Sequence, residues 1–473
     1  MENFDQPYGH GDQSERWISG EARRFEEMLS GGNYVFFDLM TLDEIYYFYV
    51  RHHKLPKALQ LVNFALQQHP HSEDLYFKRA AVSCEMGRLD DAKRDIDRAM
   101  DVNPYQMEYI FLKAEILSRE GKHRKAMQIL EGFLESHEDK HEVWFHMGSI
   151  SVGAGKWEDA EKFYNLALEA KPDFEDCVYE LAFIYESREM LKESIDLYMG
   201  YLDLHPFTAP VWYNLGILYA KLGLYEKAID AYDYALAIEE SFASAWYNKG
   251  NSFMELEKYD EALKSFLEAC VHEKPDLALH YNIAECYEHL GDFRMAAKYY
   301  HKCLDSSPEY VDAWLGLAYC MEVQQRYMEA IHYYHKVLGI DPDHFDGWVA
   351  LATCEYRMGN ATHAYEALEK ALRLNSSDLK FWQDWGEMLF HDGNEEGAIS
   401  FLREGLKVNP VLAELYFQVA GYYFRMERFE KGMTFLENGL LIDASKHYIL
   451  FHIFADLKES PAVRDLIDQY KLA

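Results

Sequence analysis

A fixed period of 34 residues constrains this sequence more than any other feature. Six tryptophans are separated by multiples of that interval: Trp144, Trp212, Trp246, Trp314, Trp348 and Trp382. Six further positions have the same phase: Leu42, Tyr76, Ile110, Val178, His280 and Tyr416. We call these twelve positions the markers. Twelve repeats therefore share one register without an insertion, and a period of this length decides the architecture before local propensity does.

Two positions in each repeat are restricted to small side chains. Eleven of the twelve residues that lie four after a marker are Ala or Gly, and all twelve that lie sixteen after it are Ala, Gly or Ser. Residues three and four apart share one face of a helix, so a large marker beside a small residue predicts closely packed helices. Glycine recurs at one phase between these positions, and proline recurs at the end of the repeat. Both residues end helices, which predicts two antiparallel helices per repeat.

The pattern resembles the tetratricopeptide repeat family, and one repeat carries the family motif most fully: Trp212, Leu215, Gly216, Tyr219, Ala228, Tyr232 and Ala235. The resemblance implies an all-α fold, a right-handed superhelical α-solenoid of helix-turn-helix repeats. We expect a disordered N-terminal tail over 1–14, a capping helix and loop over 15–38, twelve repeats over 39–446, and capping helices over 447–473.

The charge balance narrows the class of partner. Asp and Glu number 81 against 47 Lys and Arg, which gives a formal net charge of -34. This excess disfavours nucleic acid and anionic membrane surfaces, and it favours basic partners. We expect a soluble, cytoplasmic chain without membrane insertion, because neither a signal segment nor a long apolar run is visible. Seven cysteines without a Cys-x-x-Cys pair fit a reducing compartment.

The resemblance implies that the first helices of the repeats line a concave groove, which includes the two positions after each marker. The first of these columns is aromatic in seven successive repeats: Phe77, Phe111, Phe145, Tyr179, Tyr213, Tyr247 and Tyr281. Exposed rings here would form a binding track, since aromatic side chains dominate interaction hot spots. The alternative is that the rings pack against the neighbouring first helix.

The second column contains three consecutive asparagines, Asn214, Asn248 and Asn282, each preceded by tyrosine. An amide carries donors and an acceptor, so a row of amides can pair with the backbone of an extended peptide. The row resembles the asparagine ladder in the repeat domain of O-linked N-acetylglucosamine transferase. The alternative is that asparagine tolerates a solvated helix face. Acidic residues two before many markers favour a basic or uncharged peptide.

No motif in the chain indicates catalysis. The segment from Gly148 to Lys156 lacks the spacing of a phosphate loop, and His332 and His335 have no ligand partner nearby in sequence. We therefore expect no enzyme activity, cofactor or metal. The leading interpretation is a protein-interaction scaffold that binds an extended protein segment in the groove. The alternative is a permanent subunit of a larger multiprotein machine, held through its convex face or its aromatic-rich ends at 46–49 and 422–424.

Overall fold

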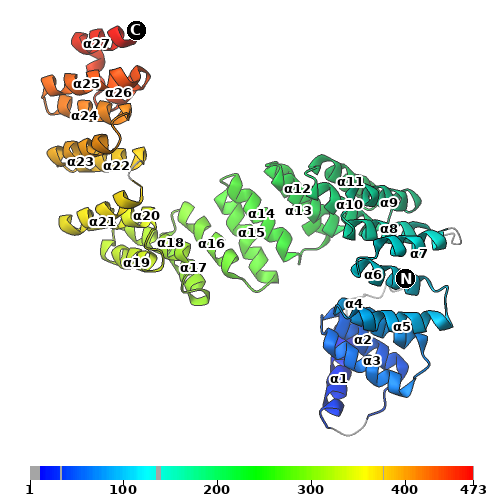
Figure 1. The fold of residues 1–473 in the computed structure, drawn as a ribbon. Helices are drawn as coiled ribbons and strands as arrows, with labels where there is room; N and C mark the ends of the chain where they lie inside the picture. The colour runs from blue at the N-terminus through cyan, green and yellow to red at the C-terminus, as the bar shows by residue number, and fades with distance from the viewer. Residues whose placement is uncertain (1–10, 32–34, 135–139, 376–377, 472–473) are drawn as a thin grey trace, which may run out of the picture. The chain divides into compact units, whose positions relative to one another are not determined.

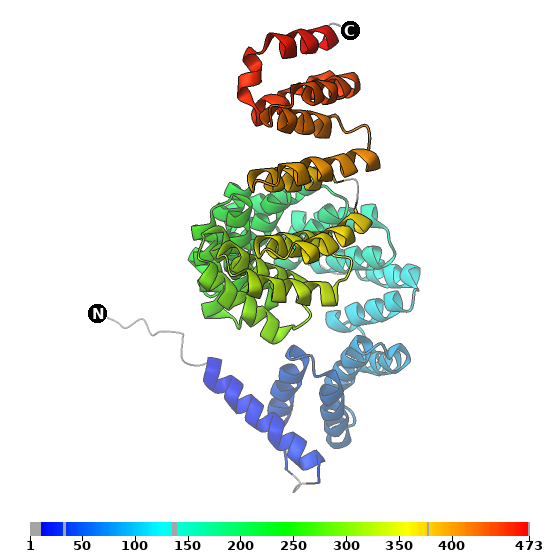
Figure 2. The same cartoon turned by 90° about the vertical axis from the view of Figure 1, so that its left-hand side faces the viewer.

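The computed structural model describes residues 11–31, 35–134, 140–375 and 378–471, and all regular structure in these ranges is helical (Figure 1). The chain divides into two compact units, which we call unit 1 (Met1–Ala245) and unit 2 (Trp246–Ala473). Within each unit, consecutive helices pack side by side in pairs, as the second view also shows (Figure 2). The fold is an all-α solenoid of helix-turn-helix repeats, as predicted.

In unit 1, one additional helix precedes six repeats. Its helices are α1 (Gly11–Leu29), α2 (Leu39–Arg51), α3 (Leu55–Gln68), α4 (Glu73–Glu85), α5 (Leu89–Val102), α6 (Met107–Arg119), α7 (His123–Leu134), α8 (Lys140–Gly153), α9 (Trp157–Ala170), α10 (Glu175–Ser187), α11 (Leu191–Leu204), α12 (Ala209–Lys221) and α13 (Tyr225–Ile238). From α2 onward, even-numbered helices are the first helices of their repeats.

In unit 2, the repeats continue and end in a cap. Its helices are α14 (Ala243–Glu255, which begins just before the unit boundary), α15 (Tyr259–His272), α16 (Leu277–His289), α17 (Phe293–Ser306), α18 (Val311–Val323), α19 (Tyr327–Ile340), α20 (Phe345–Arg357), α21 (Ala361–Leu374), α22 (Leu379–His391), α23 (Glu395–Val408), α24 (Ala413–Arg425), α25 (Phe429–Asp443), η1 (Ala444–His447), α26 (Tyr448–Ile453), η2 (Ala455–Glu459) and α27 (Pro461–Lys471).

The turn inside each repeat confirms the register of 34. One residue in every such turn has a positive φ, and in seven repeats it is the predicted glycine: Gly87, Gly121, Gly155, Gly223, Gly291, Gly359 and Gly393. The other five turns place a larger residue there: His53, Glu189, Glu257, Gln325 and Glu427. Because the left-handed region favours glycine, these five positions are the locally strained turns of the array.

The small residues beside the markers lie where a ring from the second helix crosses the first. At Gly148, Gly216 and Gly250, an added Cβ would overlap the rings of Tyr164, Tyr232 and Phe266 respectively. The small residues sixteen after the markers are likewise buried, Ala262 among them. The spacing of small side chains therefore predicted the helix crossings correctly.

The ends of the array differ from the prediction in detail. Helix α1 begins at Gly11 instead of residue 15, so residues 11–14 are helical and not part of a disordered tail. Those four residues include no apolar side chain, and hydrophobic periodicity therefore missed the first turn. Residues 1–10 lie outside the described part of the chain. Helix α1 packs on the first repeat through Phe25, whose ring meets Phe64 of α3 at 5.5 Å.

The C-terminal cap covers the last repeat. Helix α26 packs on α24, as the first helix of a further repeat would, whereas α27 packs on α25 and on the short turns η1 and η2. Leu450 occupies the marker phase and is fully buried. Within the predicted capping helices over 447–473, helix α26 stops at Ile453, because Phe454 leaves the helical conformation (φ −140°, ψ 89°) before the short η2 turn.

Candidate protein-interaction site

The aromatic column is built into the packing of each repeat. Six of the seven rings contact a ring of their own second helix, and some also contact a ring of the loop that follows; Phe77 instead contacts Tyr109 on α6, the next first helix. Phe145 meets Tyr164 at 5.7 Å and Phe174 at 5.0 Å between ring centroids. Tyr213 meets Phe242 at 4.7 Å in the same way. These rings therefore fix the spacing of the two helices, and all but Phe111 remain half-buried.

Phe111 corrects the prediction of a continuous exposed track. Its side chain is only 7% exposed, and its ring stacks on the ring of His146 at 4.0 Å. Burial in turn lowers the pKa of His146 to about 4. Phe77 packs on Tyr109 at 5.0 Å, while the phenol of Tyr179 donates a hydrogen bond to Glu175 Oε1 at 2.7 Å. In unit 1 the packing alternative accounts for these contacts.

The second column in unit 1 also serves the fold. Lys78 is 4% exposed, and its Nζ donates to Asp43 Oδ1 and Asp74 Oδ2, both at 2.6 Å. The same ammonium lies 5.6 Å from the ring of Tyr47. The side chain of Asn214 hydrogen-bonds to the phenol of Tyr198. These polar side chains hold neighbouring helices of unit 1 together.

In unit 2 the two predicted columns meet at one hydrogen-bonded cluster. Asn282 Nδ2 donates to Tyr247 Oη at 3.2 Å and to Asn251 Oδ1 at 3.0 Å. Tyr247 rests on Phe266 at 5.7 Å, and Tyr281 contacts Tyr300 and Tyr310 at 5.8 and 5.5 Å. The structure thus brings Tyr247 and Asn282 together across two repeats. Asn248 lies one turn before Asn251 on α14, and Asn214 belongs to unit 1.

This cluster borders an open hollow of about 600 Å³, which we call the α14–α16 hollow. It is lined by Asn251, Met254, Glu255, Glu257, Tyr259, Asn282, Glu285 and His289. Of the predicted site residues only Asn282 lines it. Of the residues that the sequence analysis missed, Asn251, Met254 and Glu255 follow Asn248 on α14, and Glu285 and His289 follow Asn282 on α16, at steps of three and four residues that keep them on one helix face. That spacing was the available signal. Glu257 lies in the turn after α14, and Tyr259 begins α15.

The α14–α16 hollow is acidic and has a structured rim. Three glutamates line it, and burial raises the pKa of Glu285 above its ordinary value. The ring of His289 stacks on Tyr259 at 4.1 Å, with the two planes nearly parallel. The arrangement offers carboxylates and amides to a ligand. Such groups can attract a cation and hydrogen-bond a peptide backbone.

Other side chains that could act as nucleophiles or metal ligands are dispersed. Six of the seven cysteines are buried, and burial raises the pKa of the Cys286 thiol to about 12. His332 and His335 are exposed on α19. Within the described ranges, no three His, Cys, Asp or Glu side chains gather as metal ligands would, and no helix is both long and apolar enough to cross a membrane.

Comparison with known proteins gives one consistent family. Three family models, each described as tetratricopeptide repeat, match residues 209–242 and 243–272, residues 111–173 and 281–345, and residues 323–383. No curated protein matches the sequence.

Among solved structures, the fold is similar to YrrB, described as a tetratricopeptide repeat protein with an unusual peptide-binding site (23% identity, 39% of this chain and 94% of that one, TM-score 0.36). It is also similar to a tetratricopeptide repeat protein from Parabacteroides merdae (18%, 50% and 93%, TM-score 0.37). A third similar structure is that of Naa15/Naa10 bound to HypK-THB (16%, 85% and 77%, TM-score 0.36).

Proposed function

Because the chain belongs to the tetratricopeptide repeat family, whose repeats indicate a protein-interaction scaffold, we propose that it is a non-enzymatic adaptor for an extended protein segment. The segment binds along the first helices and is centred in unit 2 on the α14–α16 hollow. It is basic or uncharged, and the binding takes place in the cytoplasm.

One observation carries this proposal. Asn282 donates through Nδ2 to two acceptors, Tyr247 Oη and Asn251 Oδ1. An amide nitrogen has two N–H groups, so both donors of Asn282 serve the protein and its orientation is fixed. Its carbonyl oxygen Oδ1 is then the atom offered to a ligand. A fixed acceptor of this kind suits a backbone N–H of an extended peptide, whatever the peptide's side chains are.

The charge of the α14–α16 hollow supports the preference for a basic segment. Glu255, Glu257 and Glu285 line it together with one histidine, in a chain of net charge -34. Lysine or arginine side chains beside the bound backbone would face these carboxylates. Such pairs on an open rim contribute modestly to affinity but accelerate association at low salt.

The test compares a triple variant with a double control variant by affinity capture and by fluorescence anisotropy. The first changes Asn214, Asn248 and Asn282 to alanine, and a matched control changes the exposed Asn165 and Asn438 on second helices. A labelled lysine-containing peptide is measured beside its backbone N-methylated form and a glutamate-containing form. We expect the first variant and N-methylation each to weaken binding about tenfold, near the effect of one hydrogen bond. Equal binding of all three peptides, or equal loss in the control, would contradict backbone recognition.

A second candidate function is a permanent subunit of a larger assembly, and one surface favours it. Phe36, Leu39 and Met40 are exposed at the start of the first repeat, Phe36 and Met40 by more than 70%. The aromatic segment over 422–424 does not support this function, because all three side chains are buried under the neighbouring helices. Changing Phe36 and Met40 to serine should release a stable partner while leaving groove peptides bound. Size-exclusion chromatography of the native complex measures this.

A further inference from the structure

A second surface, in unit 1, has the opposite charge. A hollow between α3, α4 and α5 is lined by Leu59, Asn63, Arg79, Ser83, Arg88, Asp91, Arg94, Asp95 and Arg98. We call it the arginine hollow. Four arginines and two aspartates line it, in a protein that is strongly acidic as a whole. A positive site in such a chain concentrates the local field on one small region.

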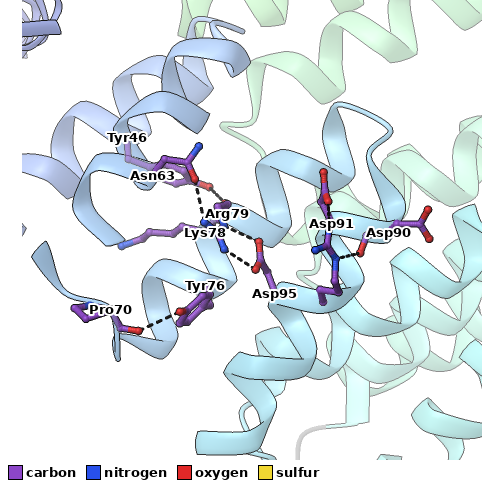
Figure 3. A network of polar contacts seen from close by, with 10 residues as sticks. Tyr46, Asn63, Pro70, Tyr76, Lys78, Arg79, Asp90, Asp91 and Asp95 are labelled. Atoms are coloured by element: carbon purple, nitrogen blue, oxygen red, sulfur yellow. Dashed lines mark hydrogen bonds and ion pairs between the residues drawn. The ribbon is translucent and has the colours of Figure 1, made fainter. Parts of the chain in front are cut away.

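Helix α5 supplies most of this surface through its spacing. Arg88, Asp91 and Arg94 follow one another at steps of three residues, and Asp95 and Arg98 come four residues after Asp91 and Arg94, which places all five on one side of the helix. On α4, the adjacent residues Lys78 and Arg79 point to opposite sides (Figure 3). Lys78 forms ion pairs with Asp43 and Asp74, whereas Arg79 lines the arginine hollow.

A rigid hydrogen-bonded wall organises the arginine hollow. Arg79 Nε and Nη2 each donate to a different oxygen of Asp95 at 2.7 Å, and Nη1 donates to Asn63 Oδ1 at 3.0 Å (Figure 3). Asp95 is 6% exposed. The guanidinium groups of Arg79 and Arg98 both lie over the ring of Tyr76, at 5.5 and 5.4 Å. Cation–π contacts of this kind fix the planes of the two guanidiniums.

Both carboxylates in the lining already have cationic partners. Asp95 is paired with Arg79, and Asp91 is paired with Arg94. Arg88 and Arg98 have no ion-pair partner in the part of the chain that the structure describes, and both are exposed. Two uncompensated guanidiniums therefore face one small hollow, which matches the charge of a single doubly charged anion.

We propose that the arginine hollow binds a phosphorylated side chain of a partner protein. A phosphoryl group carries nearly two negative charges and three acceptor oxygens, and guanidinium forks bind it in a bidentate manner. Nucleic acid fits this surface poorly. A phosphodiester backbone needs an extended cationic track, whereas Asp90, Asp97 and Asp101 flank the arginines along α5. The partner segment is distinct from the basic segment proposed for the α14–α16 hollow.

The test uses short fluorescent peptides with one phosphoserine, serine or glutamate between alanines, measured by anisotropy with the full chain. The main variant is Arg88→Gln with Arg98→Gln. The control, Arg51→Gln with Arg124→Gln, removes two exposed arginines of unit 1 outside the arginine hollow. We expect binding of the phosphopeptide alone, weakened about tenfold or more in the main variant and less than about twofold in the control, because charge-assisted hydrogen bonds contribute most of the affinity.

Equal binding of the glutamate peptide would overturn the choice of a phosphoryl group. Equal loss in both arginine variants would overturn the site, since it would reflect net charge only. An RNA oligonucleotide that binds through Arg88 and Arg98 more tightly than the phosphopeptide would overturn the class of partner. The variant with alanine at Asn214, Asn248 and Asn282 should keep phosphopeptide binding. A negative result for the arginine hollow can therefore be distinguished from a negative result for peptide binding at the α14–α16 hollow.

Discussion

Lys78 on α4 in unit 1 and Asn282 on α16 in unit 2 occupy the same position in their repeats, yet they do different work. Lys78 is buried and joins two helices through Asp43 and Asp74. Asn282 is half-buried and lines the α14–α16 hollow. The comparison teaches that membership of a column fixes where a side chain starts, while residues about one repeat away decide whether it stabilises the fold or meets a ligand.

The largest effect should come from breaking the Lys78 pairs. Lys78→Met leaves Asp43 and Asp74 close together without a cation, and the remaining carboxylates are partly exposed. We expect the free energy of unfolding to fall by about 2 to 3 kcal/mol, somewhat less than for a fully buried pair. Urea unfolding followed by circular dichroism measures it. The exposed pair Lys407–Glu404 supplies the control, and a change as small as that of Lys407→Met would contradict the structural role of Lys78.

His146, in the same column on α8, should give a pH-dependent effect of about 2 kcal/mol. Its folded-state pKa is about 4, against an unfolded value near 6.5. As the pH falls below about 6.5, the unfolded chain therefore binds a proton that the folded chain excludes, and stability is lost until about pH 4. Between pH 7 and pH 5, the stability of the wild type relative to His146→Phe should fall by about 2 kcal/mol. A difference that does not vary with pH would show that His146 is not buried as a neutral ring.

Asn282→Ala should lower the free energy of unfolding by about 1 kcal/mol. The change removes two hydrogen bonds that are partly open to water, so their net contribution is small. Asn165→Ala should change stability by less than about 0.5 kcal/mol. Thermal unfolding compares the two. A loss as large as that of Lys78→Met would place Asn282 among the residues that hold the fold and would remove the contrast between the two units.

The smallest effect on stability is expected at Glu285. Burial raises its pKa, which means that the ionised form is disfavoured in the folded state and that this penalty disappears as the pH falls through the folded pKa. Glu285→Gln should therefore raise the free energy of unfolding at pH 7 by no more than about 0.5 kcal/mol. It should also weaken binding of the lysine-containing peptide. Scanning calorimetry and anisotropy give the two readings. A decrease in stability would indicate that the carboxylate has a structural partner.

The sequence predicted the fold through residues whose effect is local. Gly250 at a helix crossing and Gly223 at a turn each act within the helix pair of their own repeat. The position of such residues in the 34-residue period was therefore enough to locate the crossings and turns. The candidate site depends on contacts between repeats, which the residue types at equivalent repeat positions do not reveal. The stacking of His146 on Phe111 joins neighbouring repeats, and so does the bond from Asn282 to Tyr247. Only the structure shows which half-buried ring is covered by the next repeat.

The arginine hollow was missed for a different reason. Net charge averages over the whole chain, so an excess of acid concealed a cluster that the spacing of Arg88, Arg94 and Arg98 already indicated. A local count along one helix face would have identified it. Charge is therefore better assessed by face than by chain in a repeat protein, where every helix presents one side to its neighbours and the other to water.

Within each unit, contacts in the described part of the chain run between successive helices and, more sparsely, between helices two apart. Such an array is a set of springs connected in series. A tension applied at the two ends of a unit is felt equally by every interface, while the extensions of the interfaces add together. The weakest interface therefore yields first, and the strained turns at Glu257, Gln325 and Glu427 mark repeats of unit 2 where a pulled array would be expected to give way before its glycine-turned neighbours.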